Sequence, residues 1–487
     1  MRVRRDKASW RADALICLAV SALLILLCSM SSPLYPINIW DDANCLLTVG
    51  RVMKAGGVLY RDIYEQKGPL LYLIHMLAAM ISQTSFLGVY CMEVIAFAFT
   101  LYAAKKTAQL WTGEGGAWAC TLLFGAAVVV GRSFARGDSA EEFCLPLLMA
   151  GLYIALSCAQ RAKGPLSARV MFLLGLMAGG AAAIKYTALG MFLGLCIAQG
   201  MAQLLRRDVR GVAVSAGAFA AGMALPILPW IAYFAAHGAL EDAYTAYIHN
   251  NIFLYDAAPR ALAQSAVELL HAGWDNLFWA LPAVAGVIAF VLDREKLAFA
   301  RACVGIGALM AGAAVFLPGK MYAYYPLMLS VFAPVGLGYA AAWLGGKVSA
   351  RALLAVSGAA ALVAAILLSP NAFLRGVPLS ETAQGKLAAR MEAGASLLQY
   401  SHLDDGLYLT HGVLPEEKYF VLLNVEFEEM RAALDGALRE GRPEYVMISW
   451  RELPEEFDKY TLIATEIGYD DENRANKEMR LYRRNDE

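Results

Sequence analysis

Two adjacent carboxylates, Asp41 and Asp42, follow the first long apolar run of the sequence and are candidates for acid–base chemistry. A carboxylate at a membrane surface is partly desolvated and, beside a second negative charge, holds its proton more tightly, which suits a general base. An acidic pair can equally belong to a solvated loop that ends a helix. The same loop also carries Glu65 and Lys67 just before an apolar segment at 69–81. This concentration of charge makes a functional site as reasonable an interpretation as the solvated loop.

A lysine and a group of tyrosines are the candidate polar groups further along the chain. Lys185 lies between two apolar runs, where a charge is costly to place in lipid. It can extend its ammonium group to the interface or bind a phosphate. Tyr322, Tyr324 and Tyr325 open a later apolar run. They fit either an aromatic belt at the membrane interface or the lining of a substrate site.

The composition requires a membrane to position these residues. The chain has 487 residues, 59% of them hydrophobic and 17% charged, whereas soluble domains carry about 25% charged residues. The deficit of charge falls almost wholly within residues 1–370. A spanning helix needs about 20 mostly apolar residues, and about eleven segments fit. The predicted spans are 14–31, 88–104, 117–132, 143–159, 168–184, 186–205, 212–236, 274–292, 299–317, 322–343 and 351–369.

The segment 69–81 is too short to span and predicts an interfacial or re-entrant helix. If it does not cross, the loops on the N-terminal side of the membrane carry roughly twice as many Lys and Arg residues as the opposite loops. The N-terminus is then cytoplasmic, and the outer face receives the long connections 32–68, 132–142 and 237–273. The basic N-terminus also fits a signal peptide, but the many later apolar runs favour an uncleaved first helix.

The C-terminal region differs in composition from the rest of the chain. Residues 1–370 predict a transmembrane domain, and residues 371–487 predict a small extracytoplasmic α/β domain. This second domain shows no phosphate-binding glycine loop and no catalytic triad. We expect strands at 406–410, 444–449, 462–467 and 479–482, with a helix over 426–439.

Small residues within the apolar runs predict helix packing. The chain has nine cysteines, none in a CxxC pattern and most inside apolar runs. They therefore indicate packing positions and neither a disulfide framework nor a zinc site. Gly175, Gly179 and Gly180 follow the small-xxx-small pattern of membrane helix contacts.

The motifs together resemble the polyprenyl-phosphate-sugar-dependent glycosyltransferases of the GT-C fold. This group, glycosyltransferase family 39 and its relatives, includes the protein mannosyltransferases and the aminoarabinose transferases of lipid A. The resemblance covers roughly residues 30–345 in layout, and its sharpest part is the first outer loop. The residues that carry it are the acidic pair, Tyr60-Arg61-Asp62, Glu65-x-Lys67-x-Pro69-Leu70, Glu141-Glu142-Phe143 with Pro146, Lys185-Tyr186-Thr187, and the tyrosines before Pro326.

The resemblance implies an all-α polytopic GT-C domain with a catalytic acid in each of two outer loops. Asp41 matches the carboxylate that deprotonates the acceptor hydroxyl, whose attack on the anomeric carbon inverts its configuration. Asp42 holds the second position of the pair and orients the acceptor. In the second outer loop, Glu142 best matches another functional acid of the relatives, followed by Asp138. Charges at helix ends are also commonly plain solvated caps.

The resemblance also implies a donor site. Lys67 matches the basic residue that binds the lipid phosphate and neutralises it as it leaves, and Arg61 and Lys185 are further candidates for that phosphate. Glu65 matches an acid that binds a divalent metal in some relatives, with His249 as a second ligand. The spacing of Glu65 and Lys67 agrees with only part of the family. The candidate substrate-lining residues are Tyr60, Tyr64, Tyr322, Tyr324 and Tyr325.

The expected function is transfer of a sugar from a polyprenyl-phosphate donor to a cell-envelope glycan, lipid or protein on the outer face of the cytoplasmic membrane. A transporter or flippase of lipid-linked sugars is one alternative, although the midplanes look apolar and no internal repeat is clear. A non-catalytic scaffold of envelope assembly is another. A divalent metal is the one cofactor that the resemblance suggests. No basic soluble patch indicates nucleic-acid binding.

Overall fold

A computed structural model of the chain describes residues 7–162, 164–254, 262–318, 321–423, 425–470 and 475–485. Several basic residues used to predict the topology lie outside these ranges, namely Arg2, Arg4, Arg5, Lys163, Arg260 and Lys320. The chain divides into two compact units. The first comprises Met1–Ser29, Glu93–Trp230 and Ala258–Ala372, and the second comprises Met30–Met92, Ile231–Ala257 and Phe373–Glu487.

This division shares with the predicted domains a boundary near residue 370. It differs in placing the first predicted outer connection and residues 237–257 of the third in the same unit as the C-terminal region. The reason is that these connections are folded and packed, and are not loose loops between spans. The division into a domain at 1–370 and a domain at 371–487 stays a prediction.

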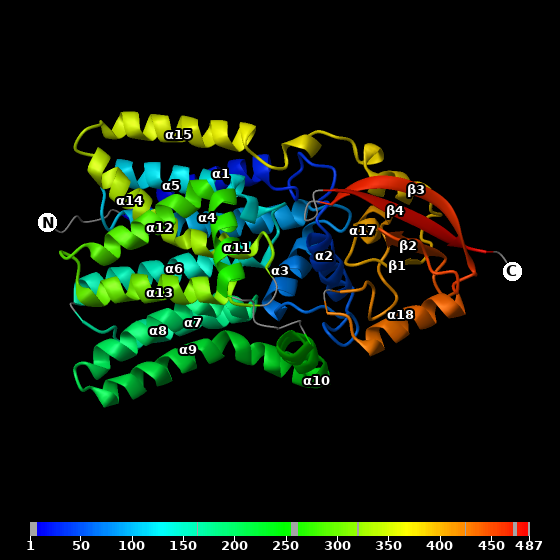
Figure 1. Cartoon of the computed structure of the whole chain (residues 1–487), viewed down its shortest axis with the longest axis horizontal. Coiled ribbons are helices and arrows are strands. Elements are labelled where there is room, and N and C mark those ends of the chain that lie inside the picture. Colours follow the sequence, from blue (N-terminus) through cyan, green and yellow to red (C-terminus); the bar gives the residue numbers. More distant parts are fainter. Residues whose placement is uncertain are drawn as a thin grey trace. The chain divides into compact units, whose positions relative to one another are not determined.

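The first unit is a bundle of helices (Figure 1). Helix α8 packs along α13, α5 along α15, and α12 along α14. Its longer helices are α1 (Lys7–Cys28), α4 (Leu87–Ala108), α5 (Glu114–Val130), α6 (Ala140–Ala162), α7 (Ala168–Ala182), α8 (Leu189–Leu204), α9 (Val209–Ala236), α11 (Leu262–Asp275), α12 (Leu277–Leu292), α13 (Ala298–Phe316), α14 (Ala333–Leu344) and α15 (Ala350–Leu367). Short 3₁₀ turns precede α6, α8 and α14, namely η1 (Arg132–Phe134), η2 (Tyr186–Ala188) and η4 (Tyr325–Phe332).

Within the described ranges, eight helices are long and apolar enough to cross a membrane. A ninth span results if α11 and α12, which meet at a bend of 115°, count as one broken crossing. Helices α5 and α7 coincide with two of the predicted spans but are shorter apolar helices. The predicted class, a polytopic helical membrane domain followed by a small α/β region, is confirmed.

Close packing of α7 on α9 depends on glycine. A Cβ atom on Gly175 would lie 2.1 Å from the backbone oxygen of Phe219, and one on Gly179 would lie 2.2 Å from that of Met223. From the other side, a Cβ atom on Gly222 would lie 2.1 Å from the backbone oxygen of Phe172. Small residues let two backbones approach closely in lipid, where no hydrophobic effect drives helices together. The predicted helix contact at Gly175 and Gly179 is therefore confirmed as the contact of α7 with α9.

The second unit begins with two helices, α2 (Asp41–Lys54) and α3 (Pro69–Ile81), that pack against each other. Gly50 permits their approach, because a Cβ atom there would lie 2.5 Å from the backbone carbon of His75. The short helix predicted at 69–81 is thus present with the predicted bounds. The segment after α9 forms α10 (Leu240–Ala243) and the π-helix η3 (Tyr244–Leu254).

The C-terminal part of this unit is a four-stranded mixed sheet in the order β1-β2-β4-β3. Strand β1 (Leu397–Gln399) is parallel to β2 (Tyr445–Ser449), and β4 (Ala475–Arg484) is antiparallel to both β2 and β3 (Tyr460–Asp470). The helices of this part are η5 (Ala372–Leu374), η6 (Leu379–Glu381), α16 (Ala383–Ala388), α17 (Leu407–His411) and α18 (Glu428–Glu440).

The sheet follows the sequence prediction with one error. Strands β2, β3 and β4 and helix α18 lie where they are expected, but the segment 406–410 is helix α17 and not a strand. Glycines in the left-handed region flank this helix, Gly406 with φ 90° and Gly412 with φ 83°. These two turns reverse the chain too soon for a strand. The short strand β1 was not predicted.

The glycine contact between α7 and α9 generates a stability prediction. Gly175→Leu should lower the apparent melting temperature of the detergent-purified protein, because the new side chain must force the α9 backbone away, at a cost of about 1–3 kcal/mol. Gly217→Leu on α9 is the matched control, since a Cβ atom there meets nothing within 4 Å. Fluorescence-detected size-exclusion chromatography after heating measures both variants. Equal melting temperatures for the two would contradict this account of the contact.

Candidate active site

The acidic pair opens α2 and lies in the second unit. Trp40 occupies the N-cap position without a side-chain cap, and Asp41 and Asp42 occupy the first turn. The dipole of the helix stabilises negative charge there. The side chain of Asp41 is 21% exposed and that of Asp42 is 5% exposed. Of the two carboxylates, Asp41 is therefore the more accessible to a substrate.

Asp42 contacts the predicted phosphate-binding lysine. Lys67 Nζ donates to Asp42 Oδ1 at 2.6 Å and to Glu65 Oε1 at 3.2 Å. The second oxygen of Glu65 accepts the backbone N–H groups of Gln66, at 2.7 Å, and of Lys67, at 3.1 Å. Burial lowers the pKa of Lys67, but the carboxylates of Asp42 and Glu65 outweigh it and hold that pKa well above its usual value. Lys67 is therefore a charged ammonium group bound by two carboxylates.

Asp41 has a partner that sequence analysis missed. Lys477, on β4, donates to Asp41 Oδ1 at 2.9 Å and Oδ2 at 3.0 Å, and also forms an ion pair with Asp405. Its side chain is 3% exposed. Burial lowers the pKa of Lys477, whereas Asp405 and Asp41 raise it by more, so the side chain stays charged. The adjacent Asp404 is buried, and its Oδ2 accepts the hydroxyl of Thr48 at 2.7 Å. Burial raises the pKa of Asp404 above its usual value.

The two tyrosines of the first loop are buried supports in this structure. Tyr60, at φ 67°, is 1% exposed and donates its hydroxyl to the backbone oxygen of Lys67 at 2.6 Å. Tyr64 is 3% exposed, and its hydroxyl accepts the side-chain N–H of Asn250 at 2.6 Å. Both side chains fix the loop that carries Glu65 and Lys67. Their predicted role in lining the substrate stays a prediction.

Arg61 and His249 contact residues other than the lysine–carboxylate pairs of this unit. Arg61 is exposed, forms an ion pair with Asp62 at 2.7 Å and donates to the backbone oxygen of His237 at 2.9 Å. His249 Nδ1 lies 3.1 Å from Asn250 Oδ1. Among the residues that the structure describes, no group of three or more His, Cys, Asp or Glu side chains is placed to hold a metal ion. Glu65 contacts Lys67 and the backbone in this structure, and the assignment of Glu65 and His249 as metal ligands stays a prediction.

The first unit contains a second acidic cluster, around the turn before α6. The backbone N–H of Asp138 donates to Glu93 Oε1 at 2.9 Å and to Glu142 Oε2 at 3.0 Å. Ser29 Oγ also donates to Glu93, at 2.9 Å. All three carboxyl residues are buried. The turn needs Gly137, at φ 81°, because a Cβ atom there would lie 2.2 Å from Ser29 Oγ.

The structure thus brings Asp138 and Glu142 together and adds Glu93, which the sequence analysis missed. A signal for Glu93 was present, because an acidic residue inside an apolar span is costly and usually has a function or a partner.

Lys185 lies in the first unit among aromatic rings and a carboxylate. It forms an ion pair with Glu141, whose side chain is 0% exposed. Its Nζ atom also lies 3.7 Å from the ring centre of Tyr325 and 5.4 Å from that of Tyr324. Tyr322 stacks on Tyr324, with ring centres 5.6 Å apart. Lys185 and the predicted tyrosines therefore form one group. The ion-pair partner of Lys185 is Glu141, which was not a predicted site residue.

The ion pair of Lys185 generates a second stability prediction. Lys185→Met leaves the Glu141 carboxylate buried without its cation and should destabilise the folded protein by about 3–5 kcal/mol. Lys185→Met combined with Glu141→Gln should recover most of this loss, because neither charge then remains buried. The apparent melting temperatures of wild type, the single variants and the double variant form the cycle. Additive effects of the two substitutions would show that the pair contributes nothing to stability.

The fold resembles that of ArnT from Cupriavidus metallidurans. The crystal structure of ArnT bound to undecaprenyl phosphate matches with a TM-score of 0.61 and 11% identity, covering 98% of this chain and 98% of that chain. ArnT in the apo state matches with a TM-score of 0.61 and 14% identity, covering 97% of each chain. No family sequence profile and no curated protein sequence matches the chain. The chain therefore has the multi-pass helical membrane fold of ArnT over nearly its whole length.

Proposed function

We propose that this protein is a membrane glycosyltransferase that moves a sugar from a polyprenyl-phosphate carrier to an acceptor in the cell envelope. The observation that carries the proposal is the fold shared with ArnT over 98% of the chain. A solved ArnT structure holds undecaprenyl phosphate, a lipid phosphate of the class proposed here. The sequence motifs that suggested this chemistry lie in helix ends and turns that hold buried, ion-paired charges.

Asp41 is the proposed general base. A hydroxyl group is a poor nucleophile at neutral pH, so its proton must be removed as its oxygen attacks the anomeric carbon. In that step the new C–O bond forms on the face opposite the breaking bond to phosphate, and configuration inverts. Asp41 suits this role better than Asp42, because its carboxylate is more exposed. Asp42 instead holds Lys67 and orients the site.

Release of the lipid phosphate requires positive charge near the leaving oxygen. Lys67, Lys185 and Arg61 are the proposed sources. Each is bound to a carboxylate in the structure, namely Asp42 and Glu65, Glu141, and Asp62. A phosphate group that binds one of these cations must therefore replace or share its carboxylate. Glu142 and Asp138 stay proposed catalytic acids.

The proposed site faces the outside of the cytoplasmic membrane. The basis is the excess of Lys and Arg in the loops that join α4 to α5, α6 to α7 and α8 to α9, which marks the cytoplasmic side. The first and third outer connections, which carry Asp41 and His249, then lie outside with the C-terminal sheet. Donor and acceptor would both reach the site from that side.

The direct test is sugar transfer by the reconstituted protein, with a panel of radiolabelled polyprenyl-phosphate sugars and an envelope extract as acceptor. Asp41→Asn keeps the shape of the side chain but removes the base, so the rate should fall by about 100-fold or more. Asp458→Asn, at an exposed position of the C-terminal region, is the matched control and should transfer at the wild-type rate. Equal rates for Asp41→Asn and wild type would exclude Asp41 as the base. No transfer from any donor by folded wild type would overturn the proposed function.

The ion pair between Asp41 and Lys477 leads to a prediction about pH. A carboxylate that loses a neighbouring cation holds its proton more tightly. In Lys477→Met, the acidic limb of the pH profile of kcat/KM should therefore move to higher pH, whereas Lys477→Arg should keep the wild-type profile. A fall in rate at every pH with an unmoved limb would mean that Lys477 serves only the fold.

A further inference from the structure

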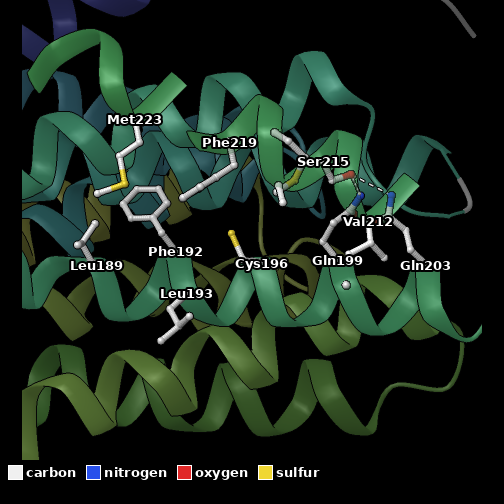
Figure 2. Close-up of a pocket in the computed structure, with 13 residues that line it drawn as sticks. Leu189, Phe192, Leu193, Cys196, Gln199, Gln203, Val212, Ser215, Phe219 and Met223 are labelled. Carbon is white, nitrogen blue, oxygen red and sulfur yellow. Dashed lines mark hydrogen bonds between the residues drawn. The ribbon is translucent and has the colours of Figure 1, made fainter. Parts of the chain in front are cut away.

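A groove of about 460 Å³ lies in the first unit between α8 and α9 (Figure 2). Most of its wall is apolar, with Phe192 and Leu193 on α8 and Phe219 and Met223 on α9. The groove follows α8 from Leu189 to Gln203, which is about 21 Å at 1.5 Å per residue. This length exceeds half of the roughly 30 Å hydrocarbon core of a bilayer. The groove therefore has the dimensions and the polarity for one extended hydrocarbon chain.

One end of the groove is polar. Ser215 Oγ accepts a hydrogen bond from Gln199 Nε2 at 3.0 Å and another from Gln203 Nε2 at 2.9 Å (Figure 2). Gln199 Nε2 also donates to the backbone oxygen of Leu166 at 3.0 Å. Gln203 is only 5% exposed, yet its Oε1 atom is buried and accepts no hydrogen bond from the described residues. A buried acceptor without a donor is costly. The groove thus has an apolar wall and, at one end, a cluster of buried amide and hydroxyl groups.

The same end of the groove carries positive charge. Arg206, Arg207 and Arg210 are exposed in and after the turn between α8 and α9. The single acidic residue of this turn, Asp208, accepts the backbone N–H of Gly211 at 2.8 Å and caps α9. Three cations and one anion leave a net positive charge, which attracts an anionic group. By the positive-inside pattern, this end faces the cytoplasm.

We propose that the groove binds an anionic glycerophospholipid of the inner leaflet. One acyl chain lies along Phe192 and Phe219, and the phosphate lies near the arginines. This combination selects phosphatidylglycerol over phosphatidylcholine, because phosphatidylcholine has no net charge. The site is separate from the residues of the proposed transfer reaction and does not depend on that function.

The test is native mass spectrometry of the purified full-length protein with palmitoyl-oleoyl phosphatidylglycerol or the phosphatidylcholine with the same chains. Wild type should retain phosphatidylglycerol about fivefold better or more. Gly200→Phe should abolish this retention, because Gly200 lines the groove and a Cβ atom there meets nothing within 4 Å. The matched control is Gly217→Phe, at an equally open position that does not line the groove, and it should bind as wild type does. Arg207→Gln with Arg210→Gln should bind both lipids equally.

Three outcomes would overturn the proposal. Equal retention of both lipids by wild type would mean that the groove binds the acyl chain of any phospholipid and does not select the headgroup. Unchanged retention by Gly200→Phe would place the lipid elsewhere. Displacement of phosphatidylglycerol by an equimolar amount of undecaprenyl phosphate, in wild type and Gly217→Phe alike, would make the groove a polyprenyl site.

Discussion

Buried and half-buried lysines bound to carboxylates are the interactions on which the rest of this structure depends. A chain that is 59% hydrophobic can bury an ammonium group only if an anion accompanies it, because an unpaired buried charge costs several kcal/mol. Lys67 meets this requirement with Asp42 and Glu65, Lys477 with Asp41 and Asp405, and Lys185 with Glu141. These contacts fix the first turn of α2, the start of β4 and the turn η2 before α8.

Glycine packing provides the backbone positions that these ion pairs require. Gly50 lets α2 approach α3, so the chain returns to place Lys67 beside Asp42. Gly137 gives the turn before α6 its left-handed conformation, and the next N–H, that of Asp138, then reaches both Glu93 and Glu142. In both places a side chain on the glycine would collide with a neighbouring element. The charged groups are therefore held by the packing of the backbone as much as by each other.

The sequence predicts well what depends on local pattern. Apolar length identified the spans and the short helix α3, and charge along the first loop identified Asp42, Glu65 and Lys67, which lie within 25 residues of one another. Prediction from the sequence fails where two residues that contact each other lie far apart along the chain. Lys477 lies 436 residues from Asp41, and no periodicity links a lysine on a strand to a carboxylate at a helix start. The prediction of a strand at 406–410 was wrong for a different reason. The apolar residues of this segment fit a strand, but the turns at Gly406 and Gly412 limit it to a short helix.

The balance of charge constrains any mechanism in the second unit. Asp41, Asp42, Glu65 and Asp405 carry four carboxyl groups around two ammonium groups, those of Lys67 and Lys477. With all of them ionised the group is negative overall, which disfavours an incoming phosphate. A phosphate can still bind Lys67 if its arrival frees Asp42 or Glu65, because the lysine then exchanges one anion for another. A base that releases its proton after each transfer restores the original net charge of this group. The charges that hold the fold together are therefore also those that the proposed reaction must rearrange.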